Sequence, residues 1–461
     1  MKTKVIYRCS QCGYESPRWM GKCSECDAWN TFEEVVNPSK AVASGSASAL
    51  AKGHRVTAKK LSEVLSGNSD RIVTGIQEFN RVLGGGIVKD SLTILTARPG
   101  AGKSTLLLQV ADDVATQEYK VLYASAEESE SQIKNRADRI LKGNKRNIWI
   151  HSDTRLNNVL ASMEELDPDL VIIDSIQTFT LEEYNSRPGS PVQTMECANE
   201  LLQAAKNSER PRAVIMVGQM TKEDEMAGLR ALEHLVDTVL ILTGENGEEL
   251  RAAWCSKNRF GSTGEIGFFS MTEQGMLSID NPSEFFMTQR EEGLKVSGSA
   301  LTVVKEGTRP IIVEVESLVS KSYTPYPSRI SECLRREQLN TLISILEQRG
   351  RIDLYDKNVV IKTTGGLQLK EQSVNLAVIL SIVSSVKDVP IPGDAVFVAD
   401  VGLTGELKKV PSLEARIREL DRMGFKKVYI AKNTLKGSLR FNQIKVIEMG
   451  NLREVIEAIL K

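Results

Sequence analysis

The segment 91–105 reads SLTILTARPGAGKST and joins three patterns in a fixed order. Residues 91–97 form an apolar run of strand length, the next residues are rich in glycine, and residues 105–116 have the apolar spacing of a helix. This order is typical of a phosphate-binding P-loop, because glycines let main-chain N–H groups turn toward the phosphates. Ala97 stands at the first glycine position of G-x-x-x-x-G-K, where we expect its small methyl group to be tolerated.

This loop carries the side chains of an ATP site with Mg²⁺. We expect Lys103 to reach the β- and γ-phosphates and the Ser104 hydroxyl to bind Mg²⁺. The predicted nucleotide contacts in this segment are Pro99, Gly100, Ala101, Gly102, Lys103, Ser104 and Thr105. A chance G-K-S triplet is disfavoured by the strand before it and the helix after it. ATP and Mg²⁺ are therefore predicted cofactors.

Apolar runs of strand length alternate with helical patterns after the P-loop. The runs are 121–125, 148–152, 170–174, 213–218 and 238–242. The alternation predicts an α/β fold with a largely parallel sheet covered by helices.

Polar side chains stand at the ends of these runs. Asp174 ends a buried apolar run, as in a Walker B strand, and is predicted to hold Mg²⁺ through a water. Glu127 is placed to orient the attacking water, although Glu127 and Glu128 could equally cap the helix that follows them. Gln219 is predicted to sense the γ-phosphate, because an amide can report its loss to a moving loop.

Four of the seven cysteines form two C-x-x-C pairs, Cys9 with Cys12 and Cys23 with Cys26. Two such turns complete a tetrahedral Zn²⁺ site with no open position, so we expect a structural metal. Disulfides would conflict with a cytosolic chain, and a redox motif does not need four cysteines. A module this short would depend on the metal to fold. The scattered cysteines are expected to be core residues: Cys197, Cys255 and Cys333.

Composition divides the chain into four predicted parts. They are a zinc module at 1–35, a flexible linker at 36–66, an ATPase domain at 67–280 and a second α/β domain at 281–461. The linker is rich in Ala, Ser, Gly and Lys and cannot bury a core. The second domain has predicted strands at 311–315, 359–363, 395–400 and 427–430, and predicted helices at 334–347, 373–387 and 413–423.

Charge and hydropathy limit the function classes. With 59 basic and 60 acidic side chains the net charge is −1, so overall charge does not argue for a polyanion partner. The longest uncharged stretch, 372–386, is shorter than the ~20 residues that span a bilayer. The N-terminus lacks the apolar core of a signal peptide. We therefore expect a cytoplasmic protein with no membrane partner.

Several motifs together resemble one known family. They are CSQCGYESPRWMGKCSECDAWNTFEE at 9–34, TGIQEFNRVLGGG at 74–86, PGAGKST at 99–105, VIIDSIQT at 171–178 and KNRFG at 257–261. Combined over the whole chain, they are similar to the RadA (Sms) family of bacterial DNA-repair proteins. This resemblance implies a RecA-like ATPase core that forms a homo-oligomer, a hexameric ring on single-stranded DNA. It also implies branch migration in homologous recombination, branched recombination intermediates as substrates and the RecA recombinase as a partner.

Lys257 and Arg259 belong to the KNRFG motif, which we expect on a loop between two strands. Cations two residues apart in extended backbone point the same way. They could reach a neighbouring subunit's γ-phosphate as a trans finger, or hold DNA phosphates in the channel of the ring. Without the family resemblance they would be read as solvated charges.

The C-terminal part resembles the proteolytic domain of Lon, a fold of the ribosomal protein S5 domain 2 type. Ser373 falls at the position of Lon's nucleophile, but Glu414 stands where the lysine base would be. Because a glutamate cannot replace that amine base, we predict a non-proteolytic scaffold. A surface for DNA, or a merely solvated one, is suggested by Lys408, Lys409, Arg416, Arg418, Lys426 and Lys427.

Three function classes remain open from the sequence. The zinc, P-loop and KNRFG combination favours a DNA-stimulated motor ATPase. An ATP-dependent serine protease of Lon type is supported only by the last domain and opposed by Glu414. A KaiC-like signalling ATPase shares the core but lacks zinc knuckles and a Lon-like domain.

Overall fold

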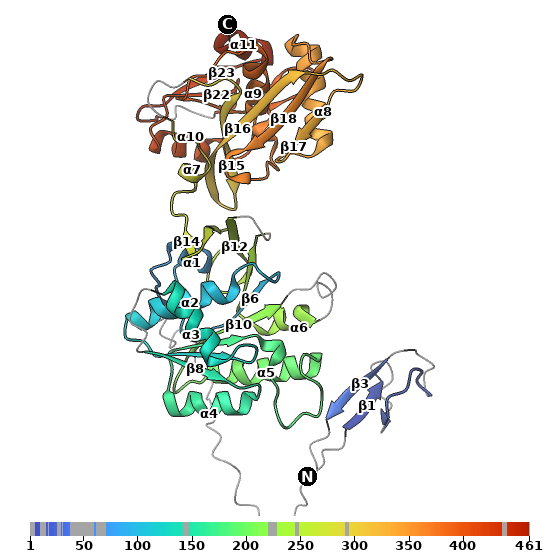
Figure 1. Ribbon diagram of the computed structural model, residues 1–461, viewed down its shortest axis with the longest axis vertical. Coiled ribbons are helices and arrows are strands. Elements are labelled where there is room, and N and C mark those ends of the chain that lie inside the picture. The colour runs from blue at the N-terminus through green and yellow to red at the C-terminus, as the bar shows by residue number, and fades with distance from the viewer. Residues whose placement is uncertain are drawn as a thin grey trace, which may run out of the picture. The chain divides into compact units, whose positions relative to one another are not determined.

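A computed structural model gives the structure of most of the chain (Figure 1). The described residues are 5–9, 15–16, 18–24, 29, 31–36, 60, 71–141, 147–219, 228–244, 249–290, 295–435 and 440–460. They fall into two compact units, one of Met1–Thr263 with Met271–Leu277 and one of Gly264–Ser270 with Ser278–Lys461. Within the described ranges, no helix is long and apolar enough to cross a membrane.

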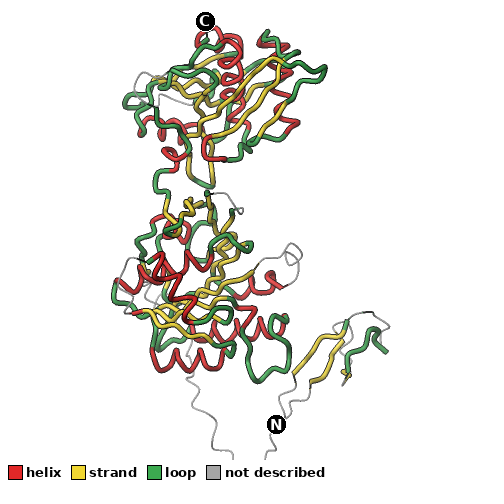
Figure 2. Tube along the Cα trace, viewed as in Figure 1, coloured by secondary structure: helices red, strands yellow, loops and turns green. Residues whose placement is uncertain are grey.

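A nine-stranded sheet in the order β14-β13-β12-β11-β6-β10-β9-β7-β8 organises residues 92–278. Figure 2 draws the strands in yellow and the helices in red. Its strands are β6 (Leu92–Ala97), β7 (Val121–Ser125), β8 (Ile148–Ser152), β9 (Leu170–Asp174), β10 (Ala213–Gln219), β11 (Thr238–Thr243), β12 (Leu250–Asn258), β13 (Ile266–Thr272) and β14 (Gly275–Ser278). Neighbours from β11 to β8 are parallel, whereas β12 is antiparallel to β11. The predicted α/β fold with a largely parallel sheet is confirmed, and β12 to β14 extend it.

Helices cover the parallel strands, whose central members are buried along their whole length. This burial on both faces explains why β6, β7 and β9 read as continuous apolar runs rather than alternating ones. Side chains of α4 (Leu156–Leu166), α5 (Pro191–Ala205) and α6 (Gly228–Leu235) share one core cluster with strand residues such as Ile94 and Ile173. The buried side of α2 (Lys103–Thr116) packs on β6, β7, β8 and β9, and α3 (Glu130–Ile140) contacts α2 and β8.

The other elements of this part are small. A 3₁₀ turn, η3 (Ile176–Thr178), follows β9, and the paired strands β4 (Arg71–Ile72) and β5 (Ile87–Val88) flank α1 (Gln77–Leu83). Near the N-terminus, β1 (Val5–Cys9) lies between β2 (Glu15–Ser16) and β3 (Phe32–Val36) in an antiparallel sheet. Of the predicted linker 36–66, only Val36 and Lys60 belong to the described residues.

A mixed seven-stranded sheet, β17-β18-β16-β15-β19-β22-β23, forms the second unit. Its strands are β15 (Ser299–Glu306), β16 (Arg309–Lys321), β17 (Arg329–Ser331), β18 (Lys357–Thr363), β19 (Ala395–Val398), β22 (Lys427–Ala431) and β23 (Lys445–Met449). Helix α9 (Asn375–Lys387) packs on β15 and β16, and its burial accounts for the uncharged stretch in the sequence. Helix α10 (Leu413–Arg422) joins a core cluster with β19 and β22. The remaining elements are α7 (Pro282–Phe285), α8 (Arg336–Ile345), η4 (Leu346–Gly350), η5 (Thr364–Gly366), η6 (Gln372–Val374), β20 (Asp400–Val401), β21 (Leu407–Lys408) and α11 (Leu452–Ile459).

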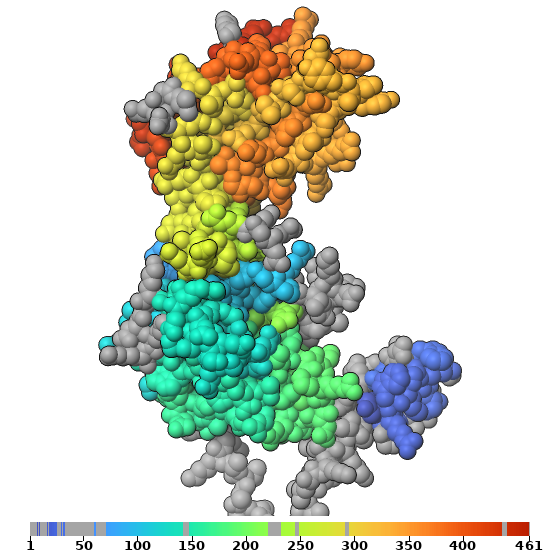
Figure 3. Space-filling model, viewed as in Figure 1, coloured from blue at the N-terminus to red at the C-terminus, as the bar shows by residue number. Residues whose placement is uncertain are grey.

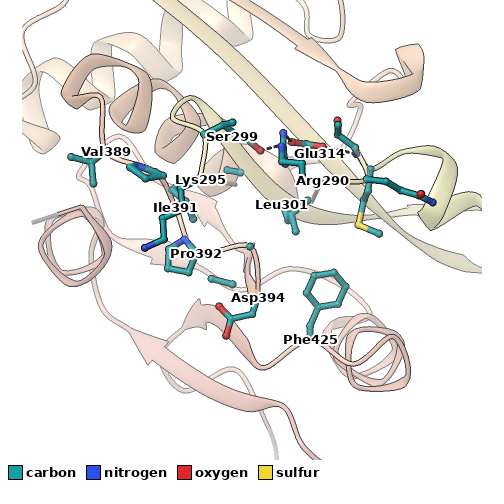
Figure 4. Close-up of a pocket in the computed structure, with 18 of the residues that line it drawn as sticks. Arg290, Lys295, Ser299, Leu301, Glu314, Val389, Ile391, Pro392, Asp394 and Phe425 are labelled. Carbon is teal, nitrogen blue, oxygen red and sulfur yellow. Dashed lines mark hydrogen bonds and ion pairs between the residues drawn. The ribbon is translucent and has the colours of Figure 1, made fainter. Parts of the chain in front are cut away.

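A cavity of about 890 Å³ in this second unit is lined by the start of β15, by the segment after α7 and by residues 389–395 (Figure 4). β15 pairs with β19 at Leu301 and Val396. The buried Glu314 carboxylate accepts hydrogen bonds from Arg290 and Ser299 beside the cavity. This anchor fixes the segment after α7 to the sheet and keeps a buried charge paired.

Arg416 corrects one expectation about the charged C-terminal surface. Its side chain is 1% exposed, its Nη2 lies 2.7 Å from Glu371 Oε2, and it also donates to the carbonyl oxygens of Val303 and Pro411. Because the guanidinium is buried within its own unit, Arg416 does not belong to a DNA-facing or solvated surface. Arg418, which is 58% exposed and lies 2.6 Å from Glu414, remains at the surface.

Replacing Arg416 by Ala should lower the free energy of unfolding of the second unit by about 3 kcal/mol, because the buried carbonyl of Val303, the carbonyl of Pro411 and the Glu371 carboxylate each lose a donor. Arg418→Ala on the same helix is the matched control and should cost less than about 0.5 kcal/mol. Urea unfolding followed by hydrogen exchange of peptides from the second unit measures both. Equal stabilities of the two variants would contradict the assignment of Arg416 to the core.

Candidate nucleotide-binding site

The predicted P-loop connects the end of β6 to the start of α2. Gly100 and Gly102 have φ angles of 82° and 103°, in the left-handed region that favours glycine. At Gly102 a Cβ atom would also collide with the side chains of Met271 and Met276. No described side chain caps the N-terminus of α2, so the amides of its first turn are available to an anion. Pro99 and Ala101 complete the loop, and Ser104 and Thr105 lie in that first turn.

Lys103 begins α2 and turns back over the loop. Its ammonium donates to the carbonyl oxygens of Ala97 at 3.1 Å and Arg98 at 3.4 Å. Burial lowers the pKa of Lys103, and the nearby carboxylates of Asp174 and Glu127 act in the opposite direction. The Lys103 ammonium and the carboxylates of Asp174 and Glu127 are therefore close enough to interact electrostatically.

Asp174 ends β9, with its side chain largely buried. Its Oδ2 accepts a hydrogen bond of 2.8 Å from the hydroxyl of Tyr123 on β7. Burial, together with the negative charge of Asp174, raises the pKa of Tyr123 well above its usual range, so the phenol keeps its proton and acts as a donor. No described residue donates to Oδ1 of Asp174, which leaves that oxygen for water around a cation.

Glu127 follows β7 and is held by residues at or directly after the ends of β9 and β10. Its Oε1 accepts from Ser175 Oγ, directly after β9, and from Gln219 Nε2 at the end of β10, at 2.9 Å. Oε2 has no donor among the described residues. The carboxylate is thus oriented on one side and free on the other, an arrangement that can receive a proton from water.

Glu127 and Glu128 do not cap α3, which was the alternative role predicted for them. Ser129 caps α3, and its side chain and that of Gln132 form a capping box. Glu128 instead forms a bidentate ion pair with Arg136 on α3, with Nη1 at 2.8 Å from Oε2. Glu127 is therefore available to the site, and Glu128 is engaged elsewhere.

Gln219 is tied to η3 as well as to Glu127. The amide of Gln177 accepts from the main-chain N–H of Gln219 and donates to its carbonyl oxygen, both at 3.3 Å. β10 therefore ends in a glutamine whose side chain contacts the carboxylate beside the P-loop.

Arg251 is a residue of this site that the sequence did not reveal. It lies on β12, is 4% exposed, and its Nε donates to the carbonyl oxygen of Ala101 in the P-loop at 3.1 Å. A single arginine in an alternating strand carries no motif, so only the antiparallel pairing of β12 with β11 shows its position.

Lys257 and Arg259 lie away from the P-loop of their own chain. Lys257 belongs to β12 rather than to a loop, and its ammonium donates to the carbonyl oxygens of Glu233 at 2.6 Å and Val236 at 2.8 Å, at the end of α6. Arg259 follows β12, is 56% exposed and lies 3.2 Å from the buried carboxylate of Asp237. Both cations therefore contact the chain around the C-terminus of α6.

The cysteine-rich module has its own small core. Cys9 and Cys23 are buried there with Phe32, and Cys9 Sγ lies 3.1 Å from Thr31 Oγ1. The sequence assigns these two thiols to different C-x-x-C pairs, and their meeting in one core fits a metal shared by both pairs. Cys12 and Cys26 lie outside the described residues.

The other cysteines are core residues, as predicted. Burial raises the pKa of Cys197 and Cys255 to about 12 and that of Cys333 to about 11, so all three are inert thiols at neutral pH.

Comparison with known proteins supports both modules. A family model for an AAA domain matches residues 58–225, and one for a rubredoxin metal binding domain matches residues 7–34. Among solved structures, the crystal structure of the RadB recombinase aligns with a TM-score of 0.36 and 23% identity, over 45% of this chain and 98% of that chain.

Full-length relatives give the family. The DNA repair protein RadA of Bacillus subtilis (strain 168) is 40% identical over 464 residues, covering 100% of this chain and 99% of the relative. RadA of Listeria monocytogenes is 38% identical, with the same coverage. RadA of Streptococcus pyogenes serotype M3 is 39% identical over 99% of both chains. With an ATPase domain, a metal-binding ribbon and this similarity from end to end, the chain belongs to the RadA family of DNA repair proteins.

Proposed function

We propose that this protein is a DNA-stimulated ATPase that works as a ring-shaped homo-oligomer, a hexamer, on single-stranded DNA. In this role it promotes branch migration and the processing of branched recombination intermediates alongside the RecA recombinase. The observation that carries the proposal is the hydrogen bond from Gln219 to Glu127. It joins the carboxylate beside the P-loop to the strand end that leads into residues 220–227, so a change at the phosphate can reach the segment that follows.

Hydrolysis then follows from the geometry of the strand ends. Lys103 exchanges its carbonyl partners for the β- and γ-phosphates, and Ser104 and Asp174 would hold Mg²⁺, which would supply positive charge beside the phosphates. Glu127 accepts a proton from the water that attacks the γ-phosphorus as the bond to the β-phosphate oxygen breaks. The hydrogen bond between Gln219 and Glu127 changes as the γ-phosphate leaves. This is the sensor role predicted from the sequence.

For the KNRFG motif we propose a role that couples the nucleotide bound at the P-loop to the binding of DNA. The Lys257 ammonium caps the C-terminus of α6, so a shift of this helix relative to β12 would change its contacts. Arg259 is anchored to Asp237 but exposed, which leaves its guanidinium accessible to a phosphate of a neighbouring subunit or of DNA.

The protease alternative has less support. Ser373 is 2% exposed, and its hydroxyl donates to Glu371, whose Oε2 also accepts from Arg416. A serine turned toward a carboxylate that is already neutralised has no amine base and no access to a peptide. We therefore retain the non-proteolytic, Lon-like scaffold as the proposed role of residues 281–461. A KaiC-like signalling role gains nothing specific from the structure.

DNA dependence and assembly are tested together in the wild-type protein. ATP turnover is measured without DNA, with single-stranded DNA and with duplex, and particle mass is measured with and without nucleotide. Stimulation by single strands in a hexameric particle is expected. A monomeric protein whose ATP turnover is the same with and without DNA would contradict the proposal and favour a signalling ATPase.

Arg259→Ala should separate a phosphate-binding role from a structural one. As a trans finger, Arg259 should contribute about 10³-fold to turnover with nucleotide binding retained. As a DNA contact, its loss should abolish stimulation and flatten the salt dependence of DNA binding. Lys206→Ala is the control, because Lys206 also lies 2.9 Å from Asp237. If both variants behave alike, or if Lys257→Ala with Arg259→Ala retains wild-type turnover and DNA affinity, the proposed role is wrong.

For the N-terminal module we propose one structural Zn²⁺ held by Cys9, Cys12, Cys23 and Cys26. Replacing Cys9 and Cys23 by Ser should release the metal and unfold only this module, because its core is too small to fold alone. Metal analysis of the purified protein should find about one zinc per chain in the wild type and in the control Cys197→Ser, whose thiol lies in the ATPase core. A wild-type protein purified without chelators and free of zinc would refute the site.

A further inference from the structure

We propose that Tyr123 is a positioning residue for the metal site, because its hydroxyl fixes Asp174 in the orientation that presents Oδ1 to the water shell of Mg²⁺. The inference rests on the proposed ATPase function and adds to it a residue outside the recognised motifs. Tyr123 lies in the middle of β7, two residues before the strand ends and four before Glu127.

The strand register explains why this hydroxyl meets this carboxylate. β7 and β9 are parallel neighbours in which Tyr123 stands opposite Ile172 and Ser125 stands opposite Asp174. A tyrosine ring is long enough to reach two residue pairs further along the sheet on the same face, and its oxygen lies 2.8 Å from Asp174 Oδ2. Both side chains are nearly excluded from solvent, so water does not replace this donor.

The alternative partner of Asp174 is the P-loop lysine. The charge of Asp174 already acts on Lys103, whose ammonium is needed at the phosphates. An Asp174 carboxylate without the tyrosine hydroxyl would turn toward Lys103 as its remaining donor. Tyr123 therefore has two effects: it aims the free oxygen of Asp174 at the cation, and it keeps the carboxylate from holding Lys103.

The two carboxylates of the site have different hydrogen-bond donors. Tyr123 donates to Asp174, the proposed Mg²⁺ residue, whereas Ser175 and Gln219 donate to Glu127, the proposed proton acceptor. Removing the Tyr123 hydroxyl should consequently weaken the contribution of Mg²⁺ to nucleotide binding and leave the contacts of the P-loop amides in place. A general loss of packing would weaken both.

The test is nucleotide binding without hydrolysis and without DNA. A fluorescent, non-hydrolysable ATP analogue is titrated into wild type and Tyr123→Phe, once in EDTA and once over a series of Mg²⁺ concentrations. Affinity in EDTA should stay within about twofold, and the Mg²⁺ concentration for half-maximal tightening should rise about tenfold, the range seen when an outer partner of a metal ligand is removed. Tyr184→Phe is the control, since its hydroxyl lies 3.2 Å from the carboxylate of Glu196 in the same unit.

A double-mutant cycle shows whether Tyr123 acts through Asp174. In an Asp174→Asn background, Tyr123→Phe should shift the Mg²⁺ dependence by less than twofold. An unchanged Mg²⁺ dependence in Tyr123→Phe, an equal change in Tyr184→Phe, or an undiminished effect in the Asn background would overturn the inference. An equal loss of affinity in EDTA and in Mg²⁺ would show a packing role and would also overturn it. Because this assay contains neither DNA nor turnover, its failure leaves the proposed motor function to its own test.

Discussion

The parallel register of β6, β10, β9 and β7 is the constraint on which the site depends. Gln219 stands opposite Ala97 at the end of one strand pair, and Asp174 stands opposite Ser125 at the end of another. The carboxyl ends of these strands therefore meet at one edge of the sheet, where the P-loop also begins. Residues that are far apart in sequence are brought together by main-chain pairing alone, so each chemical group needs only one further hydrogen bond to be oriented.

Those further hydrogen bonds keep like charges apart. Two carboxylates share the edge with one lysine, and each accepts a hydrogen bond from another strand, Asp174 from Tyr123 on β7 and Glu127 from Gln219 on β10. On the other side of β6, β11 and the antiparallel β12 bring Arg251 to the P-loop and Lys257 to the end of α6. The same sheet thus connects the phosphate-binding loop with the elements on either side of residues 220–227.

The sequence predicted the parallel strands of this sheet well, because buried parallel strands are short, apolar and flanked by polar residues. Its strands at 121–125, 148–152 and 170–174 have the predicted bounds, and Lys103, Glu127, Asp174 and Gln219 lie at or directly after strand ends and at the start of α2. The sequence did not predict the contacts that strand pairing creates. The Tyr123 hydroxyl, the Gln177 amide and Arg251 carry no local pattern, and the bounds of β12 to β15 were not predicted. Arg416 was misread as a surface cation because helical charge spacing does not reveal a buried guanidinium with three acceptors.

The measurement closest to the central claim compares Glu127→Gln with Lys103→Ala in nucleotide affinity and single-turnover ATP hydrolysis. If the strand ends assemble a hydrolytic site, Glu127→Gln should bind ATP with near-normal affinity and hydrolyse it at least about 10²-fold more slowly, since the water loses its proton acceptor. Lys103→Ala should lose hydrolysis through the loss of its phosphate contact. Turnover by Glu127→Gln at the wild-type rate would contradict the account of how this edge of the sheet works.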